Sequence, residues 1–105
     1  MKEDAVLIAR IVDSAEKISR AITGKNLEEF SAIETLPAAV TLCLTQIGEM
    51  AKRLSGDTKM KYELPWRDIT GFRDMAVHDY FDLSVPDIYE TATKDIPELI
   101  KELRS

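Results

Sequence analysis

The chain has 105 residues, of which 45% are apolar and 31% charged, a balance typical of one globular domain. Its net charge of −5 argues against non-specific binding to nucleic acid, which generally requires a basic face. No apolar run approaches the roughly 20 residues that cross a bilayer, and the start Met1-Lys2-Glu3-Asp4 lacks the apolar core of a signal peptide, so a cytoplasmic, soluble protein is expected.

The first predicted element is a helix from residue 4 to about residue 22. An apolar residue recurs every three or four positions, the spacing of one helical face, at Ile8, Ile11, Ala15, Ile18 and Ile22. Gly24 is expected to end this helix. Asn26 and Glu29 have the spacing of a capping box, which predicts a short second helix over residues 27–34.

A second long helix is predicted from Pro37 to about Leu54, because proline is tolerated in the first turn of a helix. Its apolar stripe should pack antiparallel to that of the first helix and consists of Val40, Leu44, Ile47, Ala51 and Leu54. Cys43 has no partner for an internal disulfide and is expected to be a small buried apolar residue. Ser55-Gly56-Asp57 should close the helix, and residues 58–64 are predicted to form a polar loop.

A third helix is predicted from about Trp66 to Val77, with inward positions at Ile69, Phe72 and Ala76. Residues 82–84 should form a turn in which Ser84 caps a last helix. The apolar positions of that helix are Ile88, Ala92, Ile96, Leu99 and Leu103. Pro97 predicts a kink or break near residues 94–95. Because the sequence carries no strand signal, the predicted fold is an all-α up-and-down bundle of four or five helices.

The third predicted helix ends in a polar group of residues that includes the only histidine. Asp74 and His78 are four residues apart, so the carboxylate lies one turn below the imidazole and is placed to accept a hydrogen bond from it. That bond would favour the protonated ring and leave its other nitrogen free for proton transfer. Arg73 and Tyr80, seven residues apart, share the neighbouring face if the helix continues that far. The spacing therefore places all four side chains around one shallow groove.

Each of these residues also has a purely structural interpretation. A histidine near a helix C-terminus is a favourable partner for the helix dipole. Arg73 would then belong to a salt bridge, and Tyr80 would be a core aromatic. Basic residues are also concentrated in this section of an otherwise acidic chain: Lys52, Arg53, Lys59, Lys61, Arg67 and Arg73. They form either a nucleic-acid groove or a solvated face.

Three segments of the chain resemble the HEPN superfamily and, within it, the HepT-like branch of toxins from toxin–antitoxin pairs. They are Ile47-Gly48-Glu49-x-x-Lys52-Arg53-Leu54, Pro65-Trp66-Arg67-Asp68-Ile69 and Arg73-Asp74-x-x-x-His78-x-Tyr80. The closing segment Asp95-Ile96-Pro97-Glu98-Leu99 agrees as well. The resemblance covers nearly the whole chain, which implies one HEPN/HepT-like domain over residues 1–105.

The resemblance implies a metal-independent endoribonuclease that needs no cofactor. In that chemistry a ribose 2′-oxygen attacks the adjacent phosphate, and one product ends in a cyclic phosphate. His78 would transfer the proton, Arg73 would neutralise charge on the phosphoryl oxygens, and Asp74 would orient His78. Glu49 and Arg67 are candidate groove residues because they belong to the matching segments.

Two partner hypotheses follow. In-line cleavage needs both a base and an acid, and a homodimer with two copies of the motif across one groove would supply both from a chain with one histidine. The resemblance also implies that a cognate minimal nucleotidyltransferase antitoxin transfers AMP to Tyr80, although Tyr80 could instead pack or hydrogen-bond the phosphate.

The alternative function is a catalytically silent helical module that binds a nucleotidyltransferase. It is favoured by the acidic composition and by Asp79, which stands where many relatives are expected to have a small residue.

Overall fold

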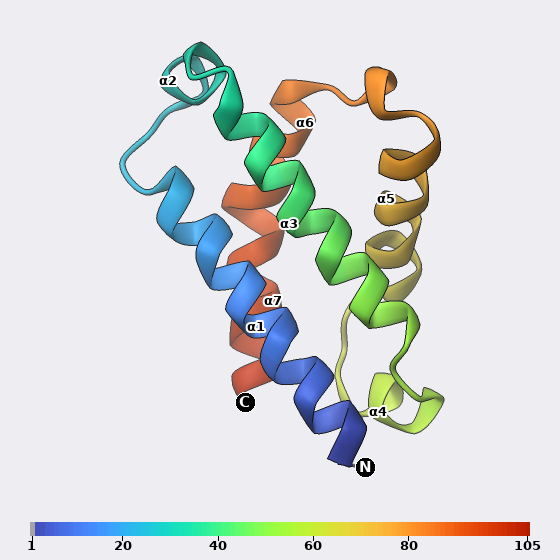
Figure 1. Cartoon of the computed structure of the whole chain (residues 1–105). Helices are drawn as coiled ribbons and strands as arrows, with labels where there is room; N and C mark the ends of the chain where they lie inside the picture. Colours follow the sequence, from blue (N-terminus) through green and yellow to red (C-terminus); the bar gives the residue numbers. More distant parts are fainter. Residues whose placement is uncertain (1) are drawn as a thin grey trace.

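The computed structural model describes residues 2–105, and within that range every regular element is a helix (Figure 1). Four principal helices run alternately up and down: α1 (Lys2–Ile22), α3 (Thr35–Lys52), α5 (Trp66–His78) and a C-terminal helix composed of α6 (Val85–Glu90), the π-helical turn η2 (Thr91–Asp95) and α7 (Ile96–Arg104). The short connecting elements are α2 (Leu27–Ala32), α4 (Gly56–Lys61) and the 3-10 turn η1 (Tyr80–Asp82). The predicted all-α up-and-down fold is confirmed.

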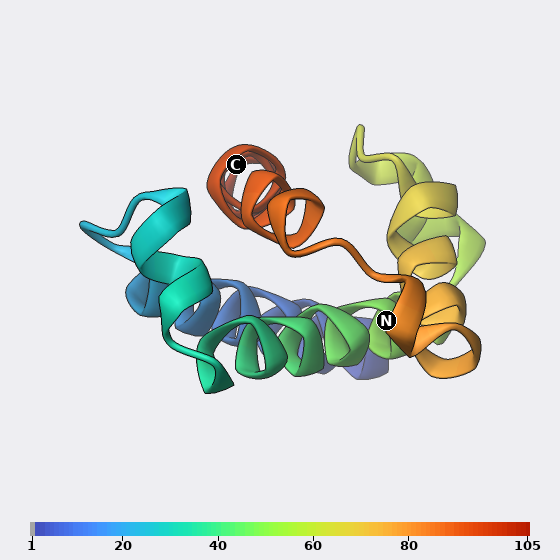
Figure 2. The ribbon, with the colours of Figure 1, turned by 90° about the horizontal axis from the view of Figure 1, so that it is seen from above.

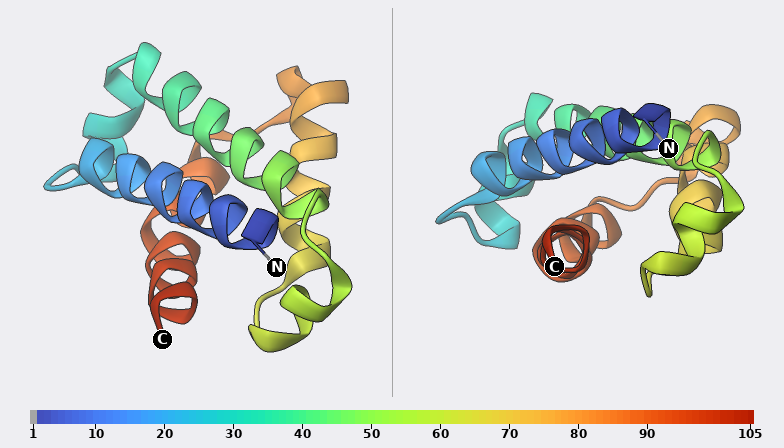
Figure 3. Two further views of the ribbon diagram at one scale, coloured as in Figure 1. Left: turned by 60° about the horizontal axis from the view of Figure 1, so that its bottom comes forward. Right: turned by 90° about the horizontal axis from the view of Figure 1, so that it is seen from below.

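The principal helices form two layers. α1 and α3 lie side by side and antiparallel, and the C-terminal helix packs across them, with α7 against α1 and α6 against α3 (Figures 1 and 2). α5 packs against the flank of α3 and stands apart from α7, as the views from above and below both show (Figures 2 and 3). The position of α5 is therefore set mainly by its crossing with α3.

None of the described helices is long and apolar enough to span a membrane.

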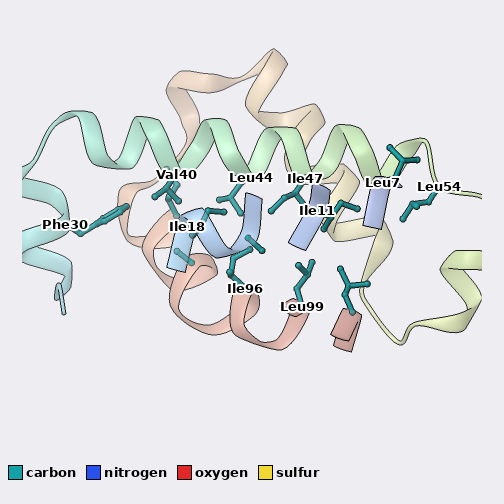
Figure 4. Packing of buried hydrophobic residues seen from close by; sticks show 14 residues of the cluster. Leu7, Ile11, Ile18, Phe30, Val40, Leu44, Ile47, Leu54, Ile96 and Leu99 are labelled. Carbon is teal, nitrogen blue, oxygen red and sulfur yellow. The ribbon is translucent and has the colours of Figure 1, made fainter. Parts of the chain in front are cut away.

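The core lies between the two layers and is built from the predicted apolar stripes (Figure 4). Every residue predicted on the stripes of α3 and of the C-terminal helix is buried. On α1 the centre of the stripe is shifted, because Leu7 is fully buried whereas Ile8 and Ile22 are only half-buried. Cys43, predicted to be buried, packs against the edge of the core and is half-buried, and this partial burial raises the pKa of its thiol.

The helix ends follow from local chemistry. The capping box is present: Asn26 Oδ1 accepts a hydrogen bond from the Glu29 N–H (2.8 Å), and the Asn26 N–H donates to Glu29 Oε1 (3.0 Å). Gly24 follows α1 in a left-handed conformation, with φ of 73°. Ser84 caps α6 as predicted, by accepting from the Asp87 N–H.

The predicted break before Pro97 takes the form of the π-helical turn η2. There the Ile96 N–H donates to the carbonyl of Thr91, five residues back rather than four. Proline has no N–H, and its ring clashes with the carbonyl four residues before it. One wider turn relieves that clash without ending the helix.

The predicted loop over residues 58–64 is wrong for residues 58–61, because α4 occupies Gly56–Lys61, and residues 62–64 form the rest of the loop as predicted. Ser55 caps this helix by accepting a hydrogen bond from the Thr58 N–H (3.2 Å). The buried carboxylate of Asp4 accepts hydrogen bonds from the hydroxyls of Ser55 and Thr58, each at 2.6 Å. These bonds hold the pKa of Asp4 below its ordinary value, and they join the start of α1 to α4.

Candidate functional site

The candidate site is built where α3 crosses α5, at Gly48. A Cβ atom on Gly48 would lie 2.4 Å from Cβ of Arg73 and 2.9 Å from the backbone oxygen of Ile69. Both distances are shorter than van der Waals contact, so only glycine permits this approach of the two helices. The crossing places two residues that follow Gly48 on α3, Glu49 and Lys52, against α5.

Four charged side chains meet at this crossing, and we call them the four-charge cluster: Glu49 and Lys52 from α3, and Arg73 and Asp74 from α5. Asp74 Oδ1 accepts hydrogen bonds from Lys52 Nζ at 2.5 Å and from Arg73 Nη1 at 3.0 Å. Arg73 Nε lies 2.7 Å from Glu49 Oε2. Its N–H does not point at that oxygen, so this contact is an ion pair rather than a hydrogen bond, and within residues 2–105 the buried Nε–H has no acceptor.

The contacts within the cluster favour the charged forms of Asp74 and Arg73. Hydrogen bonds from Lys52 and then from Arg73 hold the pKa of Asp74 below its ordinary value. The hydrogen bond to Asp74 raises the pKa of Arg73 further. Two cations and two carboxylates give the cluster a net charge of zero. The Arg73 side chain remains 26% exposed, and its Nη2 donates none of the hydrogen bonds of the described residues, so that edge of the guanidinium is available to an anion.

The predicted hydrogen bond between Asp74 and His78 is not formed in the described part of the chain, because Asp74 Oδ1 is bound to Lys52 and Arg73 instead. The two residues still lie on the same strip of α5, one turn apart. His78 is the last residue of α5, and it is exposed. The structure therefore brings Asp74 to Arg73 and leaves the imidazole open to solvent.

Tyr80 does not share the helical face of Arg73, because α5 ends at His78 and Tyr80 begins η1. Its side chain is 49% exposed, so it is not a core aromatic. Its ring meets that of Phe81 edge to face, with centroids 5.7 Å apart and an interplanar angle of 82°. The phenol thus lies at the surface, two residues beyond the exposed imidazole.

Arg67 lies two turns before Asp74 on α5 and is not part of the four-charge cluster. It contributes instead to a groove of about 670 Å³ between α5 and α7. The groove is mostly apolar, and its lining includes Leu44, Ile47, Phe72, Met75, Ile96 and Leu99. None of the motif residues Arg73, Asp74, His78 and Tyr80 lines it, so it opens on a different face of α5.

Gly48 and Lys52 were not predicted as members of the site, although both lie in a segment that resembles the family and Lys52 belongs to the predicted group of basic residues. Their signal was present, since Gly48 and Lys52 are four residues apart and Glu49 and Lys52 three apart, which places all three on one side of α3. The spacing did not indicate that α5 would pack against this side of α3. In the part of the chain that the structure describes, no group of three or more His, Cys, Asp or Glu is arranged to hold a metal ion.

Comparison with known proteins gives a consistent result. A family model described as "Ribonuclease HepT-like" matches residues 11–105. A protein named "Putative RNase" from Caldanaerobacter subterraneus subsp. tengcongensis is 32% identical over 105 residues, which are 99% of this chain and 94% of the relative. "Probable ribonuclease HepT" from Thermococcus cleftensis is 33% identical over 93 residues, 88% of this chain and 82% of the relative. No solved structure gives a significant match.

Proposed function

The chain belongs to the HepT-like family of ribonucleases, and we propose from this membership that it is an endoribonuclease that cuts RNA at Arg73 and His78. The observation that carries the assignment to these residues is the four-charge cluster. It fixes a guanidinium, with one edge available, five residues before an exposed imidazole at the end of α5. An anchored cation and an exposed proton carrier on the same helix suit the cleavage of a phosphodiester.

The proposed reaction uses the RNA's own 2′-hydroxyl. Its proton passes to a base, the 2′-oxygen bonds to the adjacent phosphorus, and the bond from phosphorus to the 5′-oxygen breaks. The leaving 5′-oxygen takes a proton from an acid, so the products are a 2′,3′-cyclic phosphate and a free 5′-hydroxyl. His78 is one of the proton-transfer groups. Arg73 stabilises the charge that builds on the phosphoryl oxygens, and the step requires no metal.

The other members of the cluster are positioning residues in this proposal. Glu49 and Asp74 hold two nitrogens of the Arg73 guanidinium before RNA arrives, so little reorganisation is needed when the phosphate binds. Lys52 holds Asp74 in turn. Asp74 thereby acts on Arg73 rather than on His78, which replaces the role implied by the family resemblance.

A homodimer would supply the second proton-transfer group, because the chain has one histidine. We test this with a mixed dimer of one wild-type and one His78→Ala subunit, isolated through two different tags. If base and acid come from different subunits, the mixed dimer is as inactive as the His78→Ala dimer. Half of the wild-type activity would refute the shared site.

We further propose that the partner is a minimal nucleotidyltransferase and that Tyr80 accepts AMP. The half-exposed phenol of Tyr80, two residues after His78, supports this choice. Its oxygen would bond to the α-phosphorus of ATP as pyrophosphate leaves, and its proton would pass to a base. The attached nucleotide would exclude RNA by its bulk and negative charge. Incubation with the enzyme and ATP should add one adenylyl mass to the wild type and to Tyr62→Phe, but not to Tyr80→Phe; an unmodified wild type would contradict the proposal.

The cleavage itself is tested with purified protein, single-stranded RNA and a chelator. The wild type should cut the RNA, and His78→Ala should abolish cutting while leaving the helical circular-dichroism spectrum and the melting temperature unchanged, because the side chain is exposed.

One observation favours the alternative function, a silent module that binds a nucleotidyltransferase: both cations of the four-charge cluster are already paired. If wild type and His78→Ala both leave RNA intact and neither arrests growth, that alternative is correct.

A further inference from the structure

The turn after α5 carries an unusually exposed aromatic residue. Phe81 is 97% exposed, whereas Leu83 and Val85, two and four residues later, pack against the core. A single exposed apolar side chain is common on protein surfaces. Phe81 differs because it forms an edge-to-face pair with Tyr80 and lies three residues after His78. At least one face of its ring is open next to the proposed cleavage site.

The turn that presents Phe81 is held by backbone hydrogen bonds. The Asp79 N–H donates to the carbonyl of Met75 (2.7 Å), the Asp82 N–H to that of Asp79 (2.9 Å), and the Leu83 N–H to that of Tyr80 (3.2 Å). Phe81 is therefore displayed at a defined place relative to the end of α5. An aromatic ring presented in this way suits stacking, which costs less when the platform is already fixed.

The charges around Phe81 favour a nucleobase over the phosphate backbone. Asp79 and Asp82 flank the aromatic pair, are exposed, and belong to no ion pair among the described residues. Two carboxylates repel phosphates, whereas a base is neutral and carries N–H donors that a carboxylate accepts. Proteins that bind single-stranded RNA stack its unpaired bases on aromatic side chains in this manner.

We propose that Phe81 is the stacking residue for an unpaired nucleobase next to the cleaved phosphate. This inference rests on the proposed ribonuclease function and extends it to the substrate, since it requires the RNA to be single-stranded at that nucleotide. Phe81 touches the substrate but transfers no proton, so it affects how well the RNA is held and aligned rather than the chemistry of the step.

The test compares variants of Phe81 on two RNAs. One is a short single-stranded RNA, and the other is the same RNA with an abasic ribose next to the cleaved phosphate. Phe81→Leu, which keeps the apolar bulk and loses the ring, should lower kcat/KM on the intact RNA by about 5- to 150-fold. On the abasic RNA wild type and Phe81→Leu should be equally slow, because there is no base to stack. Phe81→Trp should stay close to wild type on both.

Met60→Ala is the matched control, because Met60 is 87% exposed on α4 and is remote from the motif in the sequence. It should behave as wild type on both RNAs. Equal cleavage by wild type and Phe81→Leu on the intact RNA would overturn the stacking role. So would a loss of the same size on both RNAs, or a loss that tracks dissociation of a dimer in sedimentation, since Phe81 would then serve a contact between subunits.

A second measurement separates the failure of this inference from the failure of the proposed function. Binding of the intact RNA, made uncleavable by a 2′-deoxy nucleotide at the cleaved position, is measured by fluorescence anisotropy. Weaker binding by Phe81→Leu that disappears with the abasic RNA supports stacking even if the wild type cuts nothing. Binding that is independent of both the ring and the base overturns it, whether or not cleavage is seen.

Discussion

Substitution of Gly48 by alanine tests the helix crossing on which the candidate site depends. The new Cβ would lie 2.4 Å from Cβ of Arg73, whereas carbon atoms in contact are about 3.5–4.0 Å apart. The helices α3 and α5 would have to separate by about 1 Å, because neither that Cβ nor the Ile69 oxygen can rotate away. Overpacking of this kind costs about 1–3 kcal/mol, and alanine returns up to about 1 kcal/mol of helix propensity. We expect a net loss of about 1 kcal/mol.

Urea and thermal unfolding followed by circular dichroism measure this loss, which for a domain of this size lowers Tm by roughly 4–8 °C. Gly71→Ala is the matched control, since Gly71 also lies within a helix but a Cβ there meets nothing within 4 Å. It should raise stability by up to about 1 kcal/mol. Cleavage by Gly48→Ala should fall as Arg73 moves away from Glu49. A Gly48→Ala protein as stable as Gly71→Ala would refute the close crossing.

Three further predictions concern charge and capping. Asp4→Asn should be less stable than wild type near neutral pH. Because the pKa of Asp4 is lowered in the folded state, the difference in unfolding free energy between the two proteins should shrink as pH falls through that pKa. Urea unfolding between about pH 7 and pH 2 measures this difference, and a constant value would contradict the prediction. Asn26→Ala should cost about 0.5–2 kcal/mol in the same unfolding assay, with an unchanged midpoint counting against the capping box. Lys52→Gln should raise the pKa of Asp74 in a carboxyl NMR titration, because Lys52 is the main cause of its lowering; an unmoved pKa would show that the ion pair is absent in solution.

The fold was largely predictable because the apolar positions of its helices are periodic and the residues that cap the helices are close in sequence. The stripes of α3 and of the C-terminal helix follow helical spacing, and the capping box at Asn26 needs only two residues three apart. α4 was missed because Ser55-Gly56-Asp57 was interpreted as the end of the preceding helix, although Ser55 caps α4 locally. The hydrogen bonds of α4 to Asp4 join residues that are distant in sequence. Sequence spacing alone gives no indication of such a contact.

For the candidate site, the sequence predicted which residues share a face of α5 but not which side chains pair with them. The four-residue spacing correctly placed Asp74 beside His78 on α5, and it suggested a hydrogen bond between them. The carboxylate instead binds the two cations, because the crossing at Gly48 brings α3 within reach. The hydrogen-bond partners of Asp74 are thus set by how closely α3 packs against α5, which cannot be predicted from sequence spacing.

The identity of the RNA ends after cleavage tests the central proposal most directly. Purified protein is incubated in a chelator with a defined RNA, and the fragments are analysed by mass spectrometry. Attack by the 2′-oxygen predicts a 2′,3′-cyclic phosphate on one fragment and a 5′-hydroxyl on the other, and no cleavage where the attacking nucleotide is 2′-deoxy. Fragments ending in a 3′-hydroxyl and a 5′-phosphate, or cleavage of the deoxy-substituted RNA, would contradict the mechanism assigned to Arg73 and His78.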